Sequence, residues 1–363
     1  MDLGFLMVPF FTGLAAFSLA VFNNLEAVNI ESINVPGAVS AKSGFTADIV
    51  IKRLADRMHD IEVQSLTRAD AKEVMVQDSG GSAAVLGEYF NLTPLLRVVQ
   101  TSFGLIPYTL SGEIVQDKHG LVMVLRGSDN KTNHTTLIRQ TAAADDLPGL
   151  IDKTAYEAVR MIDPSLLAAY QFKKDFLTRD FTKTENVIHR ALASDETASH
   201  KWMYNLWGIV LYQEADNAGA VDKFQKALEI DPTFVSPLYN WGVVLARQGH
   251  HEEAIGKFNA VIQNWRRTDP VETLAAAYNE WGFSLALLGR TDQSIAWFRK
   301  ASELAPGFSD VYTTWAEVLS ASGHADQAHQ MTAKAIALAP VEKVYTDNLV
   351  GRIQHLPAMA TSH

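Results

Sequence analysis

The chain has 363 residues, of which 47% are hydrophobic and 20% are charged, a balance typical of a globular protein with two or three domains. Its formal net charge is −10 and no cluster of Lys and Arg stands out, which argues against nucleic acid as a main partner. Because there is no cysteine, disulfide bonds, thiolate catalysis and cysteine-bound metals are excluded.

The chain begins with an uncharged apolar stretch, residues 3–22. A helix of this length, rising 1.5 Å per residue, would just cross a hydrocarbon core of about 30 Å. We therefore predict a transmembrane signal-anchor over residues 1–22. A signal peptide cleaved after Ala20, with Ser18 as the other small residue, and a buried core helix are the alternatives.

The residues after this stretch favour a location outside the cytoplasm. Glu26 and Glu31 follow it, and no basic residue comes before Lys42. Flanks without positive charge are disfavoured on the cytoplasmic side of a membrane. The predicted localisation is therefore the bacterial inner membrane, with a single span and most of the chain in the periplasm.

Residues 27–163 combine strand-like and helix-like patterns and predict a small α+β domain. The predicted strands are 27–35, 108–116, 121–126 and 135–141, and the predicted helices are 46–60, 67–75, 93–102 and 147–162. The segment Asp117-Lys118-His119-Gly120 joins the two middle strands as a hairpin.

This hairpin contains LSGEI at Leu110–Ile114 and GLVMVLR at Gly120–Arg126. With the helix that follows, it resembles the small amino-terminal domain of TolB-type and FlgO-type bacterial envelope proteins. The resemblance implies a fold and does not by itself imply a function.

The second half of the chain repeats itself. Four tryptophans, each followed by Gly or Ala, are spaced 34, 40 and 34 residues apart: Trp207, Trp241, Trp281 and Trp315. A period near 34 residues indicates stacked helix-turn-helix units. The copies are 201–234, 235–274, 275–308 and 309–342. The four tryptophans are predicted to lie in the core, whereas Trp202, Trp265 and Trp297 are candidates for exposed contacts.

Each copy has large or small residues at fixed positions, numbered here from the first residue of the copy. In the copy that begins at Lys201, positions 4, 7, 8, 11, 20, 24, 27 and 32 are Tyr204, Trp207, Gly208, Leu211, Ala220, Phe224, Ala227 and Pro232. This pattern resembles the tetratricopeptide repeat (TPR) family over residues 165–342. The resemblance implies two antiparallel helices per copy and a stacked solenoid. Gly249, Gly289 and Gly323 are predicted to end the first helices as left-handed C-caps.

Two segments depart from the regular copies. Residues 165–200 are predicted to be a degenerate repeat, and residues 343–363 a capping helix and tail. Six extra residues near Trp265 predict a longer second helix in the copy 235–274. Such an insertion is either part of a binding face or an inert turn. The predicted fold class is mostly α: a TPR solenoid preceded by the α+β domain and one transmembrane helix.

No set of residues indicates catalysis, a cofactor or a metal site. His324 and His329 are five residues apart, which does not match the spacing of four for a zinc-binding pair on a helix. We therefore predict that the protein is not an enzyme.

The TPR resemblance implies that positions 2, 5, 9 and 12 of each first helix line a concave groove. The candidate partner-binding residues are Trp202, Asn205, Ile209, Tyr212, Tyr239, Val243, Asn279, Phe283, Thr313 and Glu317. This lining suits an extended or helical peptide, with the amides bonding to its backbone. The family's clamp for acidic chaperone tails needs Lys at position 5 and Asn at position 9. This chain has Asn205 and Ile209 there, so acidic chaperone tails are not expected as ligands of the groove.

The predicted function is a membrane-anchored scaffold that binds a peptide or protein partner in this groove and contacts the membrane through residues 3–22. Two alternatives remain open at this point. One is a regulatory or sensor subunit whose α+β domain binds a small ligand. The other is a structural subunit of an envelope complex.

Overall fold

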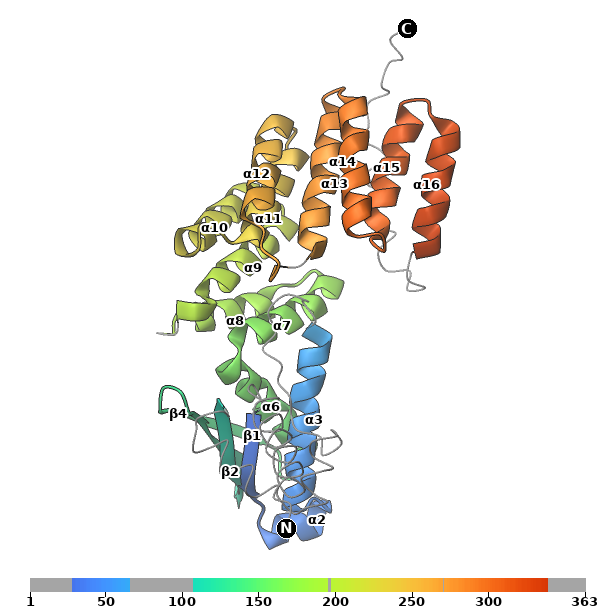
Figure 1. Cartoon of the computed structure of the whole chain (residues 1–363). Helices are drawn as coiled ribbons and strands as arrows, with labels where there is room; N and C mark the ends of the chain where they lie inside the picture. The colour runs from blue at the N-terminus through green and yellow to red at the C-terminus, as the bar shows by residue number, and fades with distance from the viewer. Residues whose placement is uncertain (1–27, 66–106, 195–196, 270, 339–363) are drawn as a thin grey trace, which may run out of the picture. The chain divides into compact units, whose positions relative to one another are not determined.

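A computed structural model describes residues 28–65, 107–194, 197–269 and 271–338 (Figure 1). Contacts within the chain divide it into two compact units, residues 1–187 and 188–363. The boundary falls inside helix α8 (Thr182–Leu192). Most of the described residues are helical, and one small sheet lies in the first unit, which confirms the mostly α class.

The sheet of the first unit has four strands in the order β1-β2-β3-β4. They are β1 (Val28–Asn34), β2 (Tyr108–Asp117), β3 (Gly120–Asp129) and β4 (His134–Ala142). β1 pairs parallel to β2, and the other pairs are antiparallel, as the predicted hairpin requires. At its turn, the carboxylate of Asp117 accepts hydrogen bonds from the backbone N–H groups of His119 (2.7 Å) and Gly120 (3.1 Å). The four predicted strands are thus confirmed.

Helices cover one face of this sheet. The first unit contains α2 (Gly37–Ser43), α3 (Ala47–Ser65), α6 (Leu147–Ile162) and α7 (Pro164–Thr178). α3 contacts β1, and α6 contacts β3 and β4 (Figure 1). The residues beneath them alternate along the strands and are almost fully buried: Leu110, Ile114, Met123 and Leu125. The predicted helices 67–75 and 93–102 lie outside the described residues.

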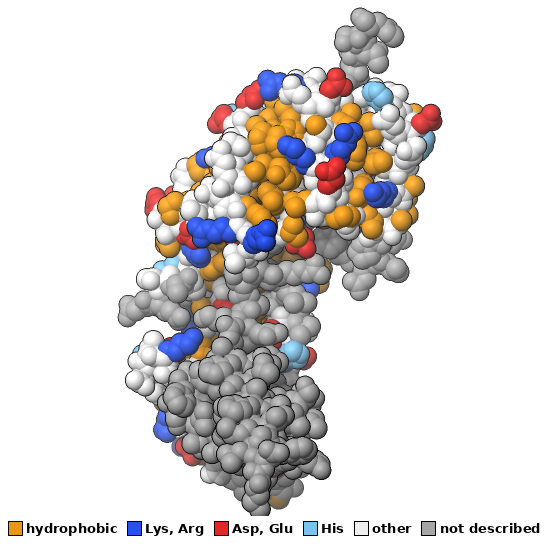
Figure 2. Space-filling model, in the orientation of Figure 1, with side chains coloured by type: hydrophobic (Ala, Val, Ile, Leu, Met, Phe, Trp, Pro, Cys, Tyr) orange, Lys and Arg blue, Asp and Glu red, His pale blue; other side chains and the backbone are white. Residues whose placement is uncertain are grey.

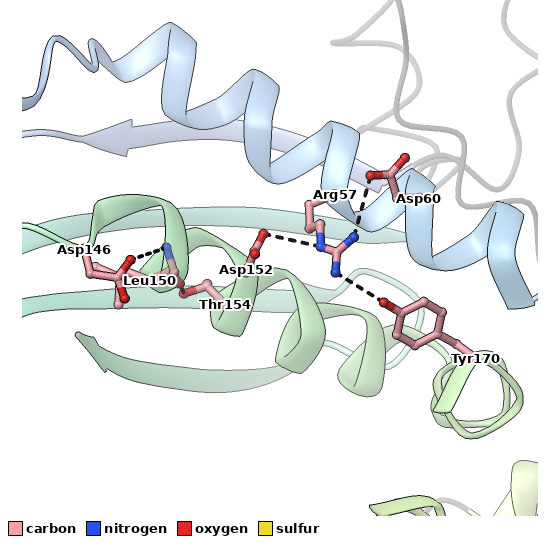
Figure 3. Close-up of polar contacts among 8 residues, drawn as sticks. Arg57, Asp60, Asp146, Leu150, Asp152, Thr154 and Tyr170 are labelled. Carbon is pink, nitrogen blue, oxygen red and sulfur yellow. Dashed lines mark hydrogen bonds and ion pairs between the residues drawn. The ribbon is translucent and has the colours of Figure 1, made fainter. Parts of the chain in front are cut away.

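The side chain of Arg57 on α3 contacts both α6 and α7 (Figure 3). Its Nε lies 3.3 Å from Oδ1 of Asp152 on α6, and its Nη2 donates a 3.2 Å hydrogen bond to the Tyr170 hydroxyl on α7. Its Nη1 lies 3.7 Å from Oδ2 of Asp60, one turn further along α3. The first helix of the predicted degenerate repeat therefore packs with the helices of the α+β part.

The second unit is an array of antiparallel helix pairs (Figure 1). The pairs are α9 (His200–Gln213) with α10 (Asn217–Ile230), α11 (Val235–Arg247) with α12 (His251–Asn264), α13 (Val271–Leu287) with α14 (Thr291–Leu304), and α15 (Ser309–Ala321) with α16 (Ala325–Leu338). Gly249, Gly289 and Gly323 follow the first helices of the last three pairs with φ of 84°, 76° and 78°, as predicted. After α9, Ala215 takes this left-handed conformation with φ of 65°.

The prediction of a longer second helix near Trp265 is wrong. α12 has 14 residues, as α10 and α14 do, whereas α13 has 17 residues and α11 and α15 have 13 each. The extra length therefore lies in the connection and in the first turn of α13. The physical reason is local: Trp265 is extended, with ψ of 135°, and packs against the core of its own copy. The backbone N–H of Arg266 then donates to Asp269 (2.7 Å).

The helices of each copy approach closely where glycine follows tryptophan. A Cβ atom on Gly242 would lie 2.5 Å from Cε1 of Phe258, which is fully buried. We expect Gly242→Val to lower the free energy of unfolding of the array by roughly 1–3 kcal/mol, because the ring has no room to move. Urea unfolding followed by circular dichroism measures this change.

Gly256 is the matched control for Gly242. It lies within α12, and a Cβ atom there would meet nothing within 4 Å. Gly256→Ala should therefore stabilise the helix by up to about 1 kcal/mol. Equal destabilisation by both variants would contradict the close approach.

The predicted single-pass localisation needs correction. Within the described ranges, no helix is both long and apolar enough to cross a bilayer, and this finding contradicts an assignment to the inner membrane. The predicted span, residues 3–22, lies outside the described residues, as does the predicted capping helix in 343–363.

Candidate functional site

Eight of the ten predicted groove residues are partly exposed on the first helices of the four copies. They are Trp202, Ile209 and Tyr212 on α9, Tyr239 and Val243 on α11, Phe283 on α13, and Thr313 and Glu317 on α15. Five of them pack against the buried clusters of the first three copies. Ile209 and Tyr212 pack against the cluster that contains Phe224, Tyr239 and Val243 against that of Phe258, and Phe283 against that of Phe298. In the first three copies the lining is therefore supported by clusters that contain a buried phenylalanine.

The two amides in the predicted lining are placed differently from the expectation. Asn205 and Asn279 are only 8% and 3% exposed. The Oδ1 atom of Asn205 accepts a 2.9 Å hydrogen bond from Asn240, and Asn279 donates to the Thr314 hydroxyl at 3.3 Å. Each bond joins position 5 of one copy to position 6 of the next. These amides therefore hold neighbouring copies in register, and alanine there would weaken the array itself.

The start of the array carries an aromatic pair with charged neighbours. Trp202 meets Phe234 edge-on, with ring centroids 4.3 Å apart. The Lys201 ammonium lies 5.4 Å and 5.1 Å from these two ring centroids and forms a 2.8 Å ion pair with Asp231. The hydrogen bond from Lys201 lowers the pKa of the Asp231 carboxyl, which favours its charged form.

The four in-register tryptophans lie between copies and are half-buried. Trp241 packs against the cluster that contains Phe224 of the copy before it, Trp281 packs against the cluster that contains Phe258, and the ring centroid of Trp315 lies 6.3 Å from that of Phe298. Trp207 meets His189 of α8 edge-on at 4.6 Å. The tryptophans thus join each copy to the preceding helix, and they retain one partly exposed side.

In three of the copies, a side chain from the second helix covers the partly exposed side of the in-register tryptophan. The ammonium groups of Lys223 and Lys257 lie 4.3 Å and 3.3 Å from the ring centroids of Trp207 and Trp241. In the third copy Trp297 stacks on Trp281 at 4.0 Å. The candidate exposed residue Trp297 is therefore half-buried in a stack.

Two further lysines cap aromatic rings one turn later in the second helix. Lys300 lies 4.2 Å from the Trp297 centroid, and Lys334 lies 4.4 Å from that of Tyr312. Burial lowers the pKa of Lys257, against an opposing effect of Glu253. The sequence reading missed this pattern, although aligning the copies on tryptophan places these side chains at positions 23 and 26.

We name this surface the lysine–aromatic seam: positions 4 and 7 of each first helix together with positions 23 and 26 of each second helix. Figure 2 shows Lys and Arg side chains among hydrophobic side chains over the helices of the array. In the part of the chain that the structure describes, no three His, Asp or Glu side chains are grouped so that they could hold a metal ion.

Comparison with known proteins gives the family of the array. A sequence model of the tetratricopeptide repeat matches residues 133–340. The chain is 27% identical over 137 residues to the photosystem I assembly protein Ycf3 of Rippkaea orientalis, which covers 37% of this chain and 79% of that protein.

Solved structures of similar arrangement include PilF of Pseudomonas aeruginosa, with 17% identity and a TM-score of 0.43, covering 55% of this chain and 84% of that one. MamA of Desulfovibrio magneticus has 18% identity and a TM-score of 0.38, covering 48% and 95%. The family match spans more than half of the chain and covers the four copies except for the last two residues of the fourth. The chain therefore belongs to the tetratricopeptide repeat family.

Proposed function

We propose that this protein is a non-catalytic scaffold that binds a peptide or protein segment along the first helices of its four copies. The observation that carries the proposal is the row of partly exposed apolar and aromatic side chains on consecutive first helices, among them Tyr212, Tyr239 and Phe283. Aromatic side chains on a rigid support are the residues that most often dominate binding energy at protein interfaces.

The arrangement also supports binding without much loss of conformational freedom. The row stands on buried phenylalanines and on the Asn205–Asn240 and Asn279–Thr314 hydrogen bonds between copies. Because these contacts order the side chains before binding, less entropy is lost when a partner docks. The relative from Rippkaea orientalis is named as an assembly protein, and holding protein components for assembly is a role that a scaffold of this kind could share.

Site-specific photo-crosslinking tests this proposal. A photoreactive phenylalanine analogue at Val243, in the middle of the row, should link the protein in cells to one or a few discrete partners. The same analogue at Gln225, an exposed residue of α10 outside the row, is the matched control. Crosslinks that form equally from both positions would contradict groove binding.

A double variant measures how much the groove aromatics contribute to the free energy of binding. Tyr212→Ala with Phe283→Ala should weaken binding of the crosslinked partner by tenfold or more, since interface aromatics of this kind contribute about 1–2 kcal/mol or more each. Circular dichroism must show that the variant keeps its helix content. Unchanged affinity in a folded variant would sink the proposal.

A further inference from the structure

The first copy of the array contains a carboxylate next to the lysine–aromatic seam. Oδ2 of Asp222 lies 2.8 Å from the ammonium of Lys223 and 3.2 Å from that of Lys226. The hydrogen bonds from Lys223 and Lys226 lower the pKa of the Asp222 carboxyl. One carboxylate at position 22 therefore bridges the lysines at positions 23 and 26.

The other three copies lack this carboxylate and keep a lysine. Position 22 is Gly256, Ala296 and Gln330 in turn, while Lys257, Lys300 and Lys334 lie over their aromatic rings. Among the described residues, no carboxylate oxygen lies within 4.0 Å of these three ammonium groups in an ion pair.

Among the described neighbours of Lys257, no acidic side chain neutralises it in the way that Asp222 neutralises Lys223. Glu253, one turn before Lys257, bonds to His250 (3.0 Å) instead. A Cβ atom on Gly256 would meet nothing within 4 Å, so the place beside Lys257 is open. The aromatic rings hold the lysines at fixed places, which reduces the entropy that an incoming anion would have to remove.

The repeat sets the spacing of these charges. The three lysines lie on the second helices α12, α14 and α16, which meet through the first helix between them: α12 contacts α13, and α14 contacts α15. Because packed helices lie about 8–10 Å apart, successive lysines are separated by at least about 10 Å. An extended chain covers about 10 Å in about three residues, at about 3.3 Å each.

We propose that the seam over the last three copies binds an extended acidic segment of a protein, whose carboxylates are at least about three residues apart and take the place that Asp222 occupies in the first copy. This surface is separate from the groove. Positions 4 and 7 point roughly 140° away from positions 2, 5, 9 and 12 on the same helix, at 100° per residue. The proposal therefore does not depend on groove binding.

The charges favour a peptide over a nucleic acid. The chain has a net charge of −10, which repels a long polyanion. Only three lysines are available on the seam, and they are separated by neutral aromatic surface. A short segment with matched carboxylates brings its charge only to these lysines.

Fluorescence anisotropy with the full chain tests the proposal. The probe is a labelled ten-residue peptide with Glu at residues 1, 4, 7 and 10 and Ser elsewhere. We expect saturable binding that weakens as salt rises, and no binding of the same peptide with Gln in place of Glu. The triple variant K257Q/K300Q/K334Q should weaken binding about tenfold, since each exposed charge pair contributes a few-fold.

Two further variants make the result specific. K118Q/K131Q/K183Q removes three exposed lysines elsewhere and should leave the affinity unchanged. G256D/A296D/Q330D keeps the seam lysines but supplies each with its own carboxylate, as in the first copy, and should weaken binding as strongly as the triple Gln variant. The groove variant Tyr212→Ala with Phe283→Ala should bind this peptide normally, which separates the two proposals.

The inference is overturned if the Gln and Glu peptides bind alike, or if neither seam variant changes the affinity. It is also overturned if a single-stranded oligonucleotide of equal charge binds more tightly than the Glu peptide at the same salt concentration.

Discussion

Replacing Phe258 by alanine should lower the free energy of unfolding of the array by about 3–5 kcal/mol. The ring is fully buried in a cluster with residues of both helices of its own copy, and the tryptophan of the next copy packs against this cluster. Alanine would leave a cavity next to Gly242, which has no side chain to fill it. Because a repeat protein is stabilised by contacts between neighbours, the loss should also uncouple the copies on either side.

Urea unfolding followed by tryptophan fluorescence measures this loss, and hydrogen exchange locates it in α11, α12 and α13. Ile336→Ala is the control, because that side chain is 71% exposed and should cost little. A Phe258→Ala variant that unfolds at the wild-type urea concentration would refute the description of the core.

Replacing Asp175 by alanine should cost roughly 2–4 kcal/mol in the first unit. Its carboxylate is 5% exposed and accepts three hydrogen bonds, one from the Gln171 amide (2.7 Å) and two from the backbone N–H (2.9 Å) and hydroxyl (2.8 Å) of Thr184. Thr184 is fully buried, so removing the acceptor leaves two donors without a partner away from water. The variant should loosen α8 from α7.

Asp180 provides a matched comparison for Asp175. It accepts the same two kinds of bond, from the backbone N–H and the hydroxyl of Thr182, but at the surface. Water can replace those bonds, so Asp180→Ala should have a clearly smaller effect on the denaturation midpoint. Similar midpoints for Asp175→Ala and Asp180→Ala would show that burial of Asp175 contributes nothing.

Local sequence patterns correctly predicted most of the secondary structure of the described residues. The alternation around Asp117–Gly120 predicted β2, β3 and their turn, because strand period and turn chemistry are both local. The glycines after α11, α13 and α15 marked their ends, since a left-handed residue is needed there. The longer α13 was missed, because Trp265 leaves the helix to pack against its own copy, a contact that periodicity does not encode.

The candidate site was predicted less well, and for a physical reason. Position numbers fix which side of a helix a residue occupies, and this placed Tyr239, Val243 and Phe283 on partly exposed surface. Position numbers do not predict which side chains of the next copy contact that side of the helix. Asn205 and Asn279 were expected to face a partner, yet Asn240 and Thr314 of the following copies reach them first.

By itself the sequence determined the repeat, its register and the paired helices, because a 34-residue period of small and large residues specifies one kind of stack. Only the tertiary structure decided how the in-register tryptophans are used. Each joins its copy to the preceding helix on one side and, in the first three copies, carries a lysine or a second tryptophan on the other. These contacts join residues that are distant in sequence. The tryptophan of each Trp-Gly pair therefore belongs both to the packing between helices and to the seam beside it.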